Sequence, residues 1–165
     1  VIPSSRFLVR RVLRRVHWPT VRVILEYGPG VGTFTAEMLR RMPADSRLIA
    51  LETNGDFVRD LHETLRDPRL TVIHDSAERA VNVLRDAGLG AADYVICGLP
   101  FTIIPGPTRD EIVSGARRIL DPDGSLLVYQ FSPTILPQLR RHFGEVRIGF
   151  EPRNILPALI FRCHP

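Results

Sequence analysis

The sequence predicts an α/β fold in which a doubly wound, mostly parallel sheet of seven strands ends in an antiparallel edge hairpin. From residue 21 onward, short runs of β-branched and other apolar residues alternate five times with helical stretches. Such βα units build a parallel sheet whose crossovers place helices on both faces. Two more strand-like runs near the end are joined by the short link 151–154. Because this link has no room for a crossover helix, the last two strands should pair antiparallel at one edge.

Each element follows from the spacing of the apolar residues, which differs between a strand and a helix. The expected strands are residues 21–27, 47–52, 70–74, 92–97, 125–131, 145–150 and 155–162. The expected helices are residues 33–42, 55–65, 77–87, 107–120 and 134–142. Thr108 and Glu111 stand at the spacing of a capping box for the fourth of these helices. A chain of 165 residues, of which 44% are apolar, is expected to form one domain over residues 1–165.

The first 18 residues are expected to form a basic cap helix ahead of a core that spans residues 21–165. Residues 1–22 hold six arginines and no acid, whereas the remainder balances sixteen arginines against eighteen acids. If Ser4 or Ser5 caps a helix, the helical periodicity places the apolar and the basic side chains on opposite sides of that helix, here called the apolar arc and the basic arc. The apolar arc holds Leu8, Val9, Val12, Leu13 and Val16, and the basic arc holds Arg6, Arg10, Arg11, Arg14 and Arg15. Two interpretations stay open: a helix packed on the sheet with a solvated arginine face, or a surface that binds lipid or nucleic acid phosphates.

Composition argues against several classes of protein. No stretch reaches the roughly 18 uninterrupted apolar residues of a membrane span, and the start lacks the apolar region of a secretory signal. Cys97 and Cys163 lie in strand-like runs and have none of the short Cys or His spacings of a zinc site. We therefore expect a protein of the reducing cytoplasm, soluble or peripheral on a membrane, with neither a metal nor a disulfide framework. The sequence does not indicate an oligomeric state.

A glycine-rich turn follows the first expected strand and opens the next helix at Thr33. In order, its residues are Glu26, Tyr27, Gly28, Pro29, Gly30, Val31 and Gly32. Glycines at such a turn let the backbone approach a nucleoside ligand. A dinucleotide fingerprint would place its third small residue at position 33, and it includes no acid two residues before its first glycine. The turn therefore favours S-adenosylmethionine over NAD, although an ordinary tight βα turn would share the glycines.

Acidic residues at the ends of the next two strands supply further candidate cofactor contacts. Glu52 ends the second strand and is followed by Thr53, at a place where a carboxylate can accept both ribose hydroxyls. Asp75 follows the third strand, where it can accept from an adenine amino group while the Ser76 backbone meets the ring edge. Since ligands of open α/β sheets bind outside these strand ends, we expect both acids to share one crevice with Glu26.

The fourth strand ends at Cys97, next to the place where the sulfonium methyl of the cofactor should point. The residues Gly98, Leu99, Pro100 and Phe101 follow it as one block. Pro100 stiffens the backbone, and Phe101 can offer its ring face to a cation or to a planar ring. A strand terminator followed by a core Phe is the alternative interpretation. The block contains no Asp, Glu or His, so the sequence names no catalytic base.

At these residues the sequence resembles the bacterial phospholipid N-methyltransferases and the rRNA adenine dimethylases, which share the Rossmann-like class I methyltransferase core. The segment 3–8 is similar to the Pro-Ser-Ser start of the phospholipid enzymes. The stretch 153–158 is similar to their Arg-Asn-x-Pro-Pro-Ala motif, with Leu156 in place of the first Pro. Adenine methylases carry Asn where this chain has Gly98. Gly-Leu-Pro is the form typical of the phospholipid group, so the resemblance favours lipid over base methylation.

The resemblance implies a transferase that moves methyl groups from S-adenosylmethionine to the amine of phosphatidylethanolamine-type phospholipids and releases S-adenosylhomocysteine. It implies that Ser5 lies in a segment that caps the cofactor, and that the basic helix contacts an anionic membrane surface on its inner, cytoplasmic face. Arg153 is the candidate contact for the lipid phosphate, and the block 98–101 positions the acceptor. An rRNA adenine dimethylase-like enzyme and a small-molecule N-methyltransferase are the alternatives, and Gly98 makes nucleic acid the less favoured partner.

Overall fold

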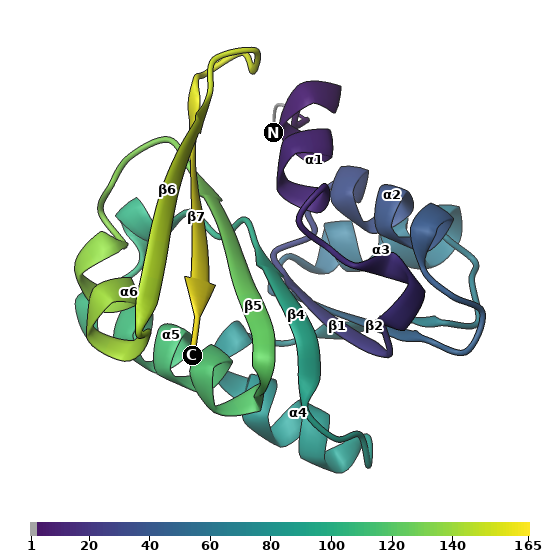
Figure 1. Cartoon of the computed structure of the whole chain (residues 1–165). Coiled ribbons are helices and arrows are strands. Elements are labelled where there is room, and N and C mark those ends of the chain that lie inside the picture. The colour runs from purple at the N-terminus through teal and green to yellow at the C-terminus, as the bar shows by residue number, and fades with distance from the viewer. Residues whose placement is uncertain (1–2) are drawn as a thin grey trace.

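The seven-stranded sheet with helices on both faces is confirmed by a computed structural model, which describes residues 3–165 (Figure 1). The strand order is β3-β2-β1-β4-β5-β7-β6. Strands β1 to β5 pair in parallel, whereas β7 is antiparallel to both β5 and β6. The expected edge hairpin is therefore present. Because β6 runs in the same direction as β5, the β6–β7 loop lies at the edge where the parallel strands end.

The bounds of most elements agree with the prediction to within a few residues. The strands are Val23–Tyr27 (β1), Arg47–Glu52 (β2), Leu70–His74 (β3), Ala92–Cys97 (β4), Leu120–Gln130 (β5), Glu145–Glu151 (β6) and Ala158–His164 (β7). The α-helices are Arg6–Leu13 (α1), Thr33–Arg41 (α2), Gly55–Thr64 (α3), Ala80–Asp86 (α4), Gly106–Ile119 (α5) and Leu136–His142 (α6). The 3-10 turns are Trp18–Thr20 (η1), Ala77–Arg79 (η2) and Phe101–Ile103 (η3).

Several predicted boundaries were wrong. The cap helix expected over residues 1–18 is α-helical over Arg6–Leu13, and residues 1–2 lie outside the described range. The last strand begins at Ala158 rather than at 155, since Pro157 has no N–H to donate to a ladder. β5 begins at Leu120, which pairs with Ala92 ahead of an irregularity in the β4–β5 register. The helix expected over 77–87 starts as the 3-10 turn η2 and becomes α-helical at Ala80.

The prediction of a capping box at the start of α5 was also wrong. The residue before the helix is Pro105, no side chain caps the first turn, and Thr108 and Glu111 lie inside the helix. Pro107 explains the earlier start, because its fixed φ suits the first turn and its missing N–H would have had no helical partner there.

Alternation along β1 directs its side chains to the two faces of the sheet. Ile24 packs with α1 and α2, whereas Leu25 and Tyr27 pack in the cluster that includes α4, α5 and α6. Two buried clusters, one on each face, make up the core. By the same alternation Glu26 belongs to the α1 and α2 face, where a carboxyl among apolar side chains requires a polar partner.

Helix α1 lies beside α2 on the sheet (Figure 1) and buries the predicted apolar arc. The Ser5 hydroxyl caps it by accepting from the Leu8 N–H at 3.2 Å. All five apolar residues of the arc are 6% exposed or less: Leu8, Val9, Val12, Leu13 and Val16. The arginines of the opposite arc are exposed, apart from the half-buried Arg11. The packing of α1 against the sheet is thus confirmed, and its charges are left on the surface.

Leu13→Ala should lower the free energy of unfolding by about 2–5 kcal/mol, the usual cost of truncating a buried leucine, because Leu13 is 0% exposed. Urea denaturation followed by circular dichroism measures this loss. The exposed neighbour Arg14 provides the matched control, and Arg14→Ala should change stability by less than about 0.5 kcal/mol. A loss below about 1 kcal/mol for Leu13→Ala would mean that α1 is not part of the cooperative core.

Candidate functional site

The glycine turn, the end of β2 and the Gly98 block meet at the carboxyl ends of three adjacent strands. The Gly28 N–H donates to the Leu51 carbonyl at 2.9 Å, and the Gly98 N–H donates to the Tyr27 carbonyl at 3.0 Å. Both bonds extend the strand ladders past their last paired residues. Strand pairing therefore fixes the positions of these segments around the crevice in which open α/β sheets bind ligands.

All three glycines of the turn have left-handed backbone angles, with φ of 74°, 57° and 88° at Gly28, Gly30 and Gly32. Residues with a side chain rarely adopt this conformation. A Cβ atom at Gly28 would lie 2.9 Å from Leu99 Cδ2, whereas one at Gly30 would meet no atom within 4 Å. The turn is therefore covered by Leu99 at Gly28 and open at Gly30, where a ligand can approach the backbone.

Glu52 holds the turn from the neighbouring strand. Its carboxylate accepts from the Gly30 N–H at 3.0 Å and from the Asn54 N–H at 2.9 Å, and the residue is only 8% exposed. A carboxylate has about four acceptor positions. Acceptor capacity therefore remains on Glu52 for the hydroxyls of a ligand in the crevice.

Glu26 is a buried carboxyl group, and one of its two oxygens has no hydrogen-bond partner among residues 3–165. One oxygen accepts from the Thr35 hydroxyl of α2, and the other, Oε2, is buried without a hydrogen-bond partner among residues 3–165. Burial raises the pKa of Glu26 to about 8, and the charge of nearby Glu52 adds to the rise, whereas the bond from Thr35 opposes it. Glu26 is therefore protonated at neutral pH until a donor or cation comes within reach.

Asp75, which follows β3, forms its contacts with residues close to it in the sequence. The Asp75 carboxylate accepts from the N–H of Ser76 at 2.7 Å and lies 3.7 Å from Arg79 Nε. The Ser76 N–H, which was expected to meet an adenine ring, is thus occupied by its neighbour. The carbonyl of Thr53 lies 2.9 Å from His74 Nε2. No hydrogen bond within residues 3–165 joins Asp75 to the glycine turn.

Tyr129 fills the space beside Gly98. A Cβ atom at Gly98 would overlap the hydroxyl and ring of Tyr129, so position 98 has no room for a side chain unless Tyr129 moves. The Tyr129 ring stacks on Phe34 of α2, with centroids 4.4 Å apart and planes at 12°. Burial raises the pKa of the phenol well above its usual value, and Glu26 and Cys97 add to the rise once they ionise at high pH. The phenol therefore keeps its proton.

A pocket of about 190 Å³ opens at this place. It is lined by Gly98, Leu99, Pro100, Thr102, Tyr129, Gln130, Phe131 and Ser132. The Gln130 side-chain amide donates to the Leu99 carbonyl at 2.6 Å and so ties the block to β5. Phe101 is 1% exposed in the core, whereas the ring of Phe131 is 58% exposed. The aromatic rings at the pocket are therefore those of Tyr129 and Phe131, and sequence reasoning singled out neither of them.

Two other predicted cofactor residues act here as packing groups. Tyr27 and Cys97 are 0% and 1% exposed and lie in the core cluster of the α5 face. Burial raises the pKa of the Cys97 thiol to about 12, so the thiol is neutral at physiological pH. Both side chains pack in the core beneath the strand ends, and the Tyr27 carbonyl accepts from the Gly98 N–H.

The β6–β7 loop is tied to the start of α1 at the same edge of the sheet. The Ser5 N–H donates to Asn154 Oδ1 at 2.8 Å. Arg153 donates from Nε to the buried Glu151 carboxylate at 2.8 Å, and its guanidinium lies 4.5 Å from the ring centroid of Phe7. The bond from Arg153 lowers the pKa of Glu151 to about 2, and the charge of Arg11 contributes. The structure therefore brings Ser5 and Arg153 together.

Comparison with known proteins identifies the family. Residues 24–124 match the family model described as a methyltransferase domain. The chain is 32% identical over 163 residues to the ornithine lipid N-methyltransferase of Singulisphaera acidiphila, which covers 98% of this chain and 85% of that protein. The chain belongs to the class I S-adenosylmethionine-dependent methyltransferases. The predicted cofactor and the predicted enzyme class, an N-methyltransferase, are thereby confirmed.

The methyltransferase is also 28% identical over 118 residues to the ribosomal RNA small subunit methyltransferase A of Aromatoleum aromaticum, which covers 72% of this chain but 42% of that protein. Among solved structures, precorrin-6y C5,15-methyltransferase of Geobacter metallireducens has a TM-score of 0.74 at 18% identity and covers 94% of this chain and 84% of that one. The N-methyltransferase NodS of Bradyrhizobium japonicum has a TM-score of 0.72 at 15% identity, with coverages of 95% and 92%. At these identities the structural likeness establishes the fold alone.

Two further findings concern the described part of the methyltransferase. Within residues 3–165, His, Cys, Asp and Glu side chains form no group of three or more that could hold a metal ion. In the same range no helix has the length and apolar character needed to cross a membrane.

Glu26 makes stability depend on pH. In the folded chain its carboxyl keeps its proton up to a pKa of about 8, whereas the ordinary value is 4.5. Between these values the folded state binds the extra proton, so stability falls as pH rises, and the full loss is reached above pH 8. Glu26→Gln, which keeps a neutral acceptor for Thr35, should therefore raise the melting temperature at about pH 9 and change it little at about pH 5.

Thermal denaturation followed by circular dichroism at both pH values measures the effect. Glu63→Gln provides the control, because Glu63 is an exposed acid of α3, and it should behave like the wild type at both pH values. An increase for Glu26→Gln that is the same at low and high pH would contradict a buried neutral carboxyl.

Proposed function

We propose that the methyltransferase acts on the amine of a phosphatidylethanolamine-type phospholipid at an anionic membrane surface in the cytoplasm. The observation that carries the proposal is that Tyr129 fills the side-chain space at Gly98. Adenine methylases resembling this chain use an Asn at that position to hold the target base, and here that Asn would overlap the phenol. The relative that N-methylates ornithine lipid supports a lipid amine as the acceptor.

The crevice at Gly30 is the proposed cofactor site. S-adenosylmethionine supplies an electrophilic methyl group on its sulfonium when it is bound. Glu52 retains acceptor capacity for the ribose hydroxyls, and Glu26 has a buried oxygen without a partner, which a polar ligand would satisfy. Asp75 accepts one hydrogen bond, from the Ser76 N–H, so it retains acceptor positions for an adenine amino group. The other residues assigned to the cofactor contribute backbone or packing: Ser5, Tyr27, Gly28, Gly32, Thr53 and Cys97.

The chemistry requires alignment more than acid–base groups. In methyl transfer to an amine, the new N–C bond forms as the C–S bond breaks, and the amine proton leaves to water. No Asp, Glu or His lines the pocket, so we name no general base. Removal of an ammonium group from water favours its neutral form, which is the nucleophile. The protonated phenol of Tyr129 would position that amine within the pocket framed by the block 98–101.

Cations formed by successive methylation would be held by aromatic ring faces. Phe131 is the exposed ring that lines the pocket, together with the stacked ring of Tyr129. Phe101 is buried in the core, so we propose that it supports the block 98–101 by packing and does not contact the acceptor.

The membrane contact proposed for α1 is electrostatic. Since the apolar arc packs on the sheet, α1 would meet lipid through Arg10, Arg11, Arg14 and Arg15 rather than by insertion. Each basic residue near an anionic surface contributes about 1 kcal/mol. The β6–β7 loop adds two apolar residues, Ile155 and Leu156, which are 71% and 54% exposed. This loop lies at the edge of the sheet where the parallel strands end. Arg153, in the same loop, is our proposed contact for the lipid phosphate.

Glu52→Ala should weaken S-adenosylmethionine binding by about 2–3 kcal/mol, because it removes charge-assisted contacts to the cofactor and frees the Gly30 N–H. Isothermal titration calorimetry measures the affinity. Asp56→Ala removes an exposed acid four residues away and should bind the cofactor like the wild type. Equal affinity for wild type and Glu52→Ala would contradict the assignment of the ribose site.

The acceptor can be decided by one comparison of methyl transfer from labelled S-adenosylmethionine. We expect incorporation into phosphatidylethanolamine vesicles and little into ribosomal RNA or small water-soluble amines. Tyr129→Phe keeps the stack on Phe34 and removes the hydroxyl, so it should lower the turnover rate about 10-fold or more while leaving cofactor affinity unchanged. RNA or small amines as the preferred acceptor would contradict the lipid proposal. Full turnover of Tyr129→Phe would exclude the phenol from positioning the amine.

A further inference from the structure

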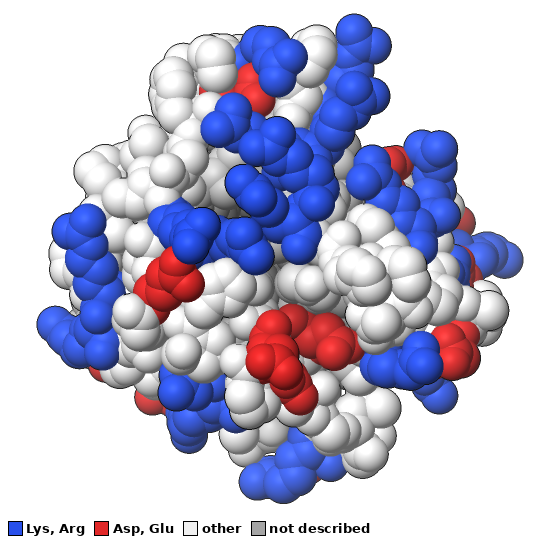
Figure 2. Space-filling view, viewed as in Figure 1, with Lys and Arg blue, Asp and Glu red and all other residues white. Residues whose placement is uncertain are grey.

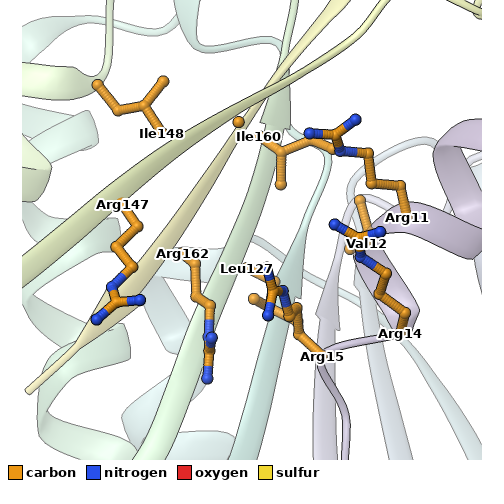
Figure 3. Close-up of a pocket in the computed structure, with 10 residues that line it drawn as sticks. Arg11, Val12, Arg14, Arg15, Leu127, Arg147, Ile148, Ile160 and Arg162 are labelled. Carbon is orange, nitrogen blue, oxygen red and sulfur yellow. The ribbon is translucent and has the colours of Figure 1, made fainter.

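Five arginines from two distant parts of the chain line one pocket. The pocket has a volume of about 220 Å³ and lies between α1 and the sheet face of β5, β7 and β6. Its arginines are Arg11, Arg14, Arg15, Arg147 and Arg162. Figure 3 shows their side chains reaching into it from the α1 side and from the strands. Figure 2 shows arginine side chains gathered across the middle of this face, between α1 and the edge hairpin.

The positive charge of this arginine pocket is only partly compensated. Arg147 pairs with Glu145 at 2.5 Å, and Arg11 lies 3.7 Å from Glu151. The other three arginines form no ion pair with any residue of 3–165, and no acidic residue lines the pocket. A bound anion would supply the missing charge.

The edge hairpin places two of these arginines directly opposite each other. Arg147 of β6 and Arg162 of β7 are paired in register, an arrangement that destabilises a sheet when both residues carry the same charge. Arg162 Nε is also buried without a hydrogen-bond partner among the described residues. A buried donor of this kind is costly unless it meets an acceptor. Repulsion and an unused donor at one place both favour an anionic ligand.

We infer that the arginine pocket is a binding site for a phosphate group, carried by an anionic lipid headgroup or by a free phosphate compound. Guanidinium groups match phosphate oxygens in bidentate geometry and remain charged at every physiological pH. The rest of the lining includes Val12, Leu127, Ile148 and Ile160, so the same pocket can cover the apolar part of a phosphate ester.

The arginine pocket and the pocket at Gly98 have different lining residues. Arg162 pairs with Leu127, three residues before the end of β5, so the pocket lies on the face of the sheet rather than at its carboxyl edge. No residue assigned to the cofactor, to the block 98–101 or to Arg153 lines the pocket. The inference therefore holds whichever amine the methyltransferase modifies.

The double variant Arg147→Gln/Arg162→Gln tests the site. A matched control, Arg47→Gln/Arg140→Gln, removes two exposed positive charges elsewhere on the molecule and keeps the same net charge as the variant. Inorganic phosphate should raise the melting temperature of the wild type and the control at constant ionic strength, because it binds the folded state. The double variant should lose this increase. In phosphate-free chloride buffer it should melt no lower than the wild type, since the cross-strand repulsion is gone.

Vesicles identify the source of the phosphate group. Sedimentation with phosphatidylglycerol vesicles is compared with neutral phosphatidylcholine vesicles for all three proteins. Loss of the phosphate effect together with about tenfold or more weaker binding of the double variant to phosphatidylglycerol assigns the site to a lipid headgroup. Loss of the phosphate effect alone assigns it to a free phosphate compound. An equal phosphate effect in all three proteins overturns the inference.

Discussion

The hydrogen bond from the Gly30 N–H to the Glu52 carboxylate is the contact on which the geometry of the site depends. The turn consists largely of glycines with positive φ, so it has few side chains with which to hold itself. It is fixed from outside, by Glu52 at Gly30 and by the ladder bond from Gly28 to Leu51. The same carboxylate is the one that we propose for the ribose of the cofactor. Strand register thus sets the floor of the crevice before any ligand arrives, which is the kind of preorganisation a binding site on rigid elements requires.

Helix α1 shows how packing distributes charge over the surface. Its apolar arc is buried against the sheet, so the arginines between those residues in sequence must face outward. The arrangement fixes where the positive potential of the chain lies. The edge hairpin adds Arg147 and Arg162 to the same face, although they are separated from α1 by more than a hundred residues. A basic chain with a net charge of +4 therefore concentrates its excess charge beside one pocket, which attracts anions far more than an even distribution would.

Local patterns in the sequence predicted the fold well, because βα units follow from short-range periodicity and strand ends carry recognisable residues. The strands 47–52, 70–74 and 92–97 have the predicted bounds, and Glu52 lies at the end of β2 beside the glycine turn. The errors came from competing local chemistry. At the start of α5, Pro107 set the boundary instead of Thr108. Phe101 was interpreted as a pocket residue with a core residue as the alternative, and the structure buries it in the core.

What the sequence could not predict depends on pairings between distant segments. Tyr129 lies in a strand-like run with no motif around it, and its place beside Gly98 follows only from the β4–β5 register. Likewise, the opposition of Arg147 and Arg162 follows from the register of the hairpin, which a shift of one residue would change. Neither pair is visible until the sheet is assembled.

Under the proposed function, the pairing of Gly98 with Tyr129 makes acceptor choice depend on two positions. A side chain at 98 and a large ring at 129 exclude each other, because they claim the same volume. An enzyme that holds a planar base with Asn at the first position needs a smaller or displaced residue at the second. Here the ring at 129 is anchored by its stack on Phe34 of α2. The glycine is therefore one half of a packed arrangement that leaves a hydroxyl, instead of an amide, at the proposed acceptor pocket.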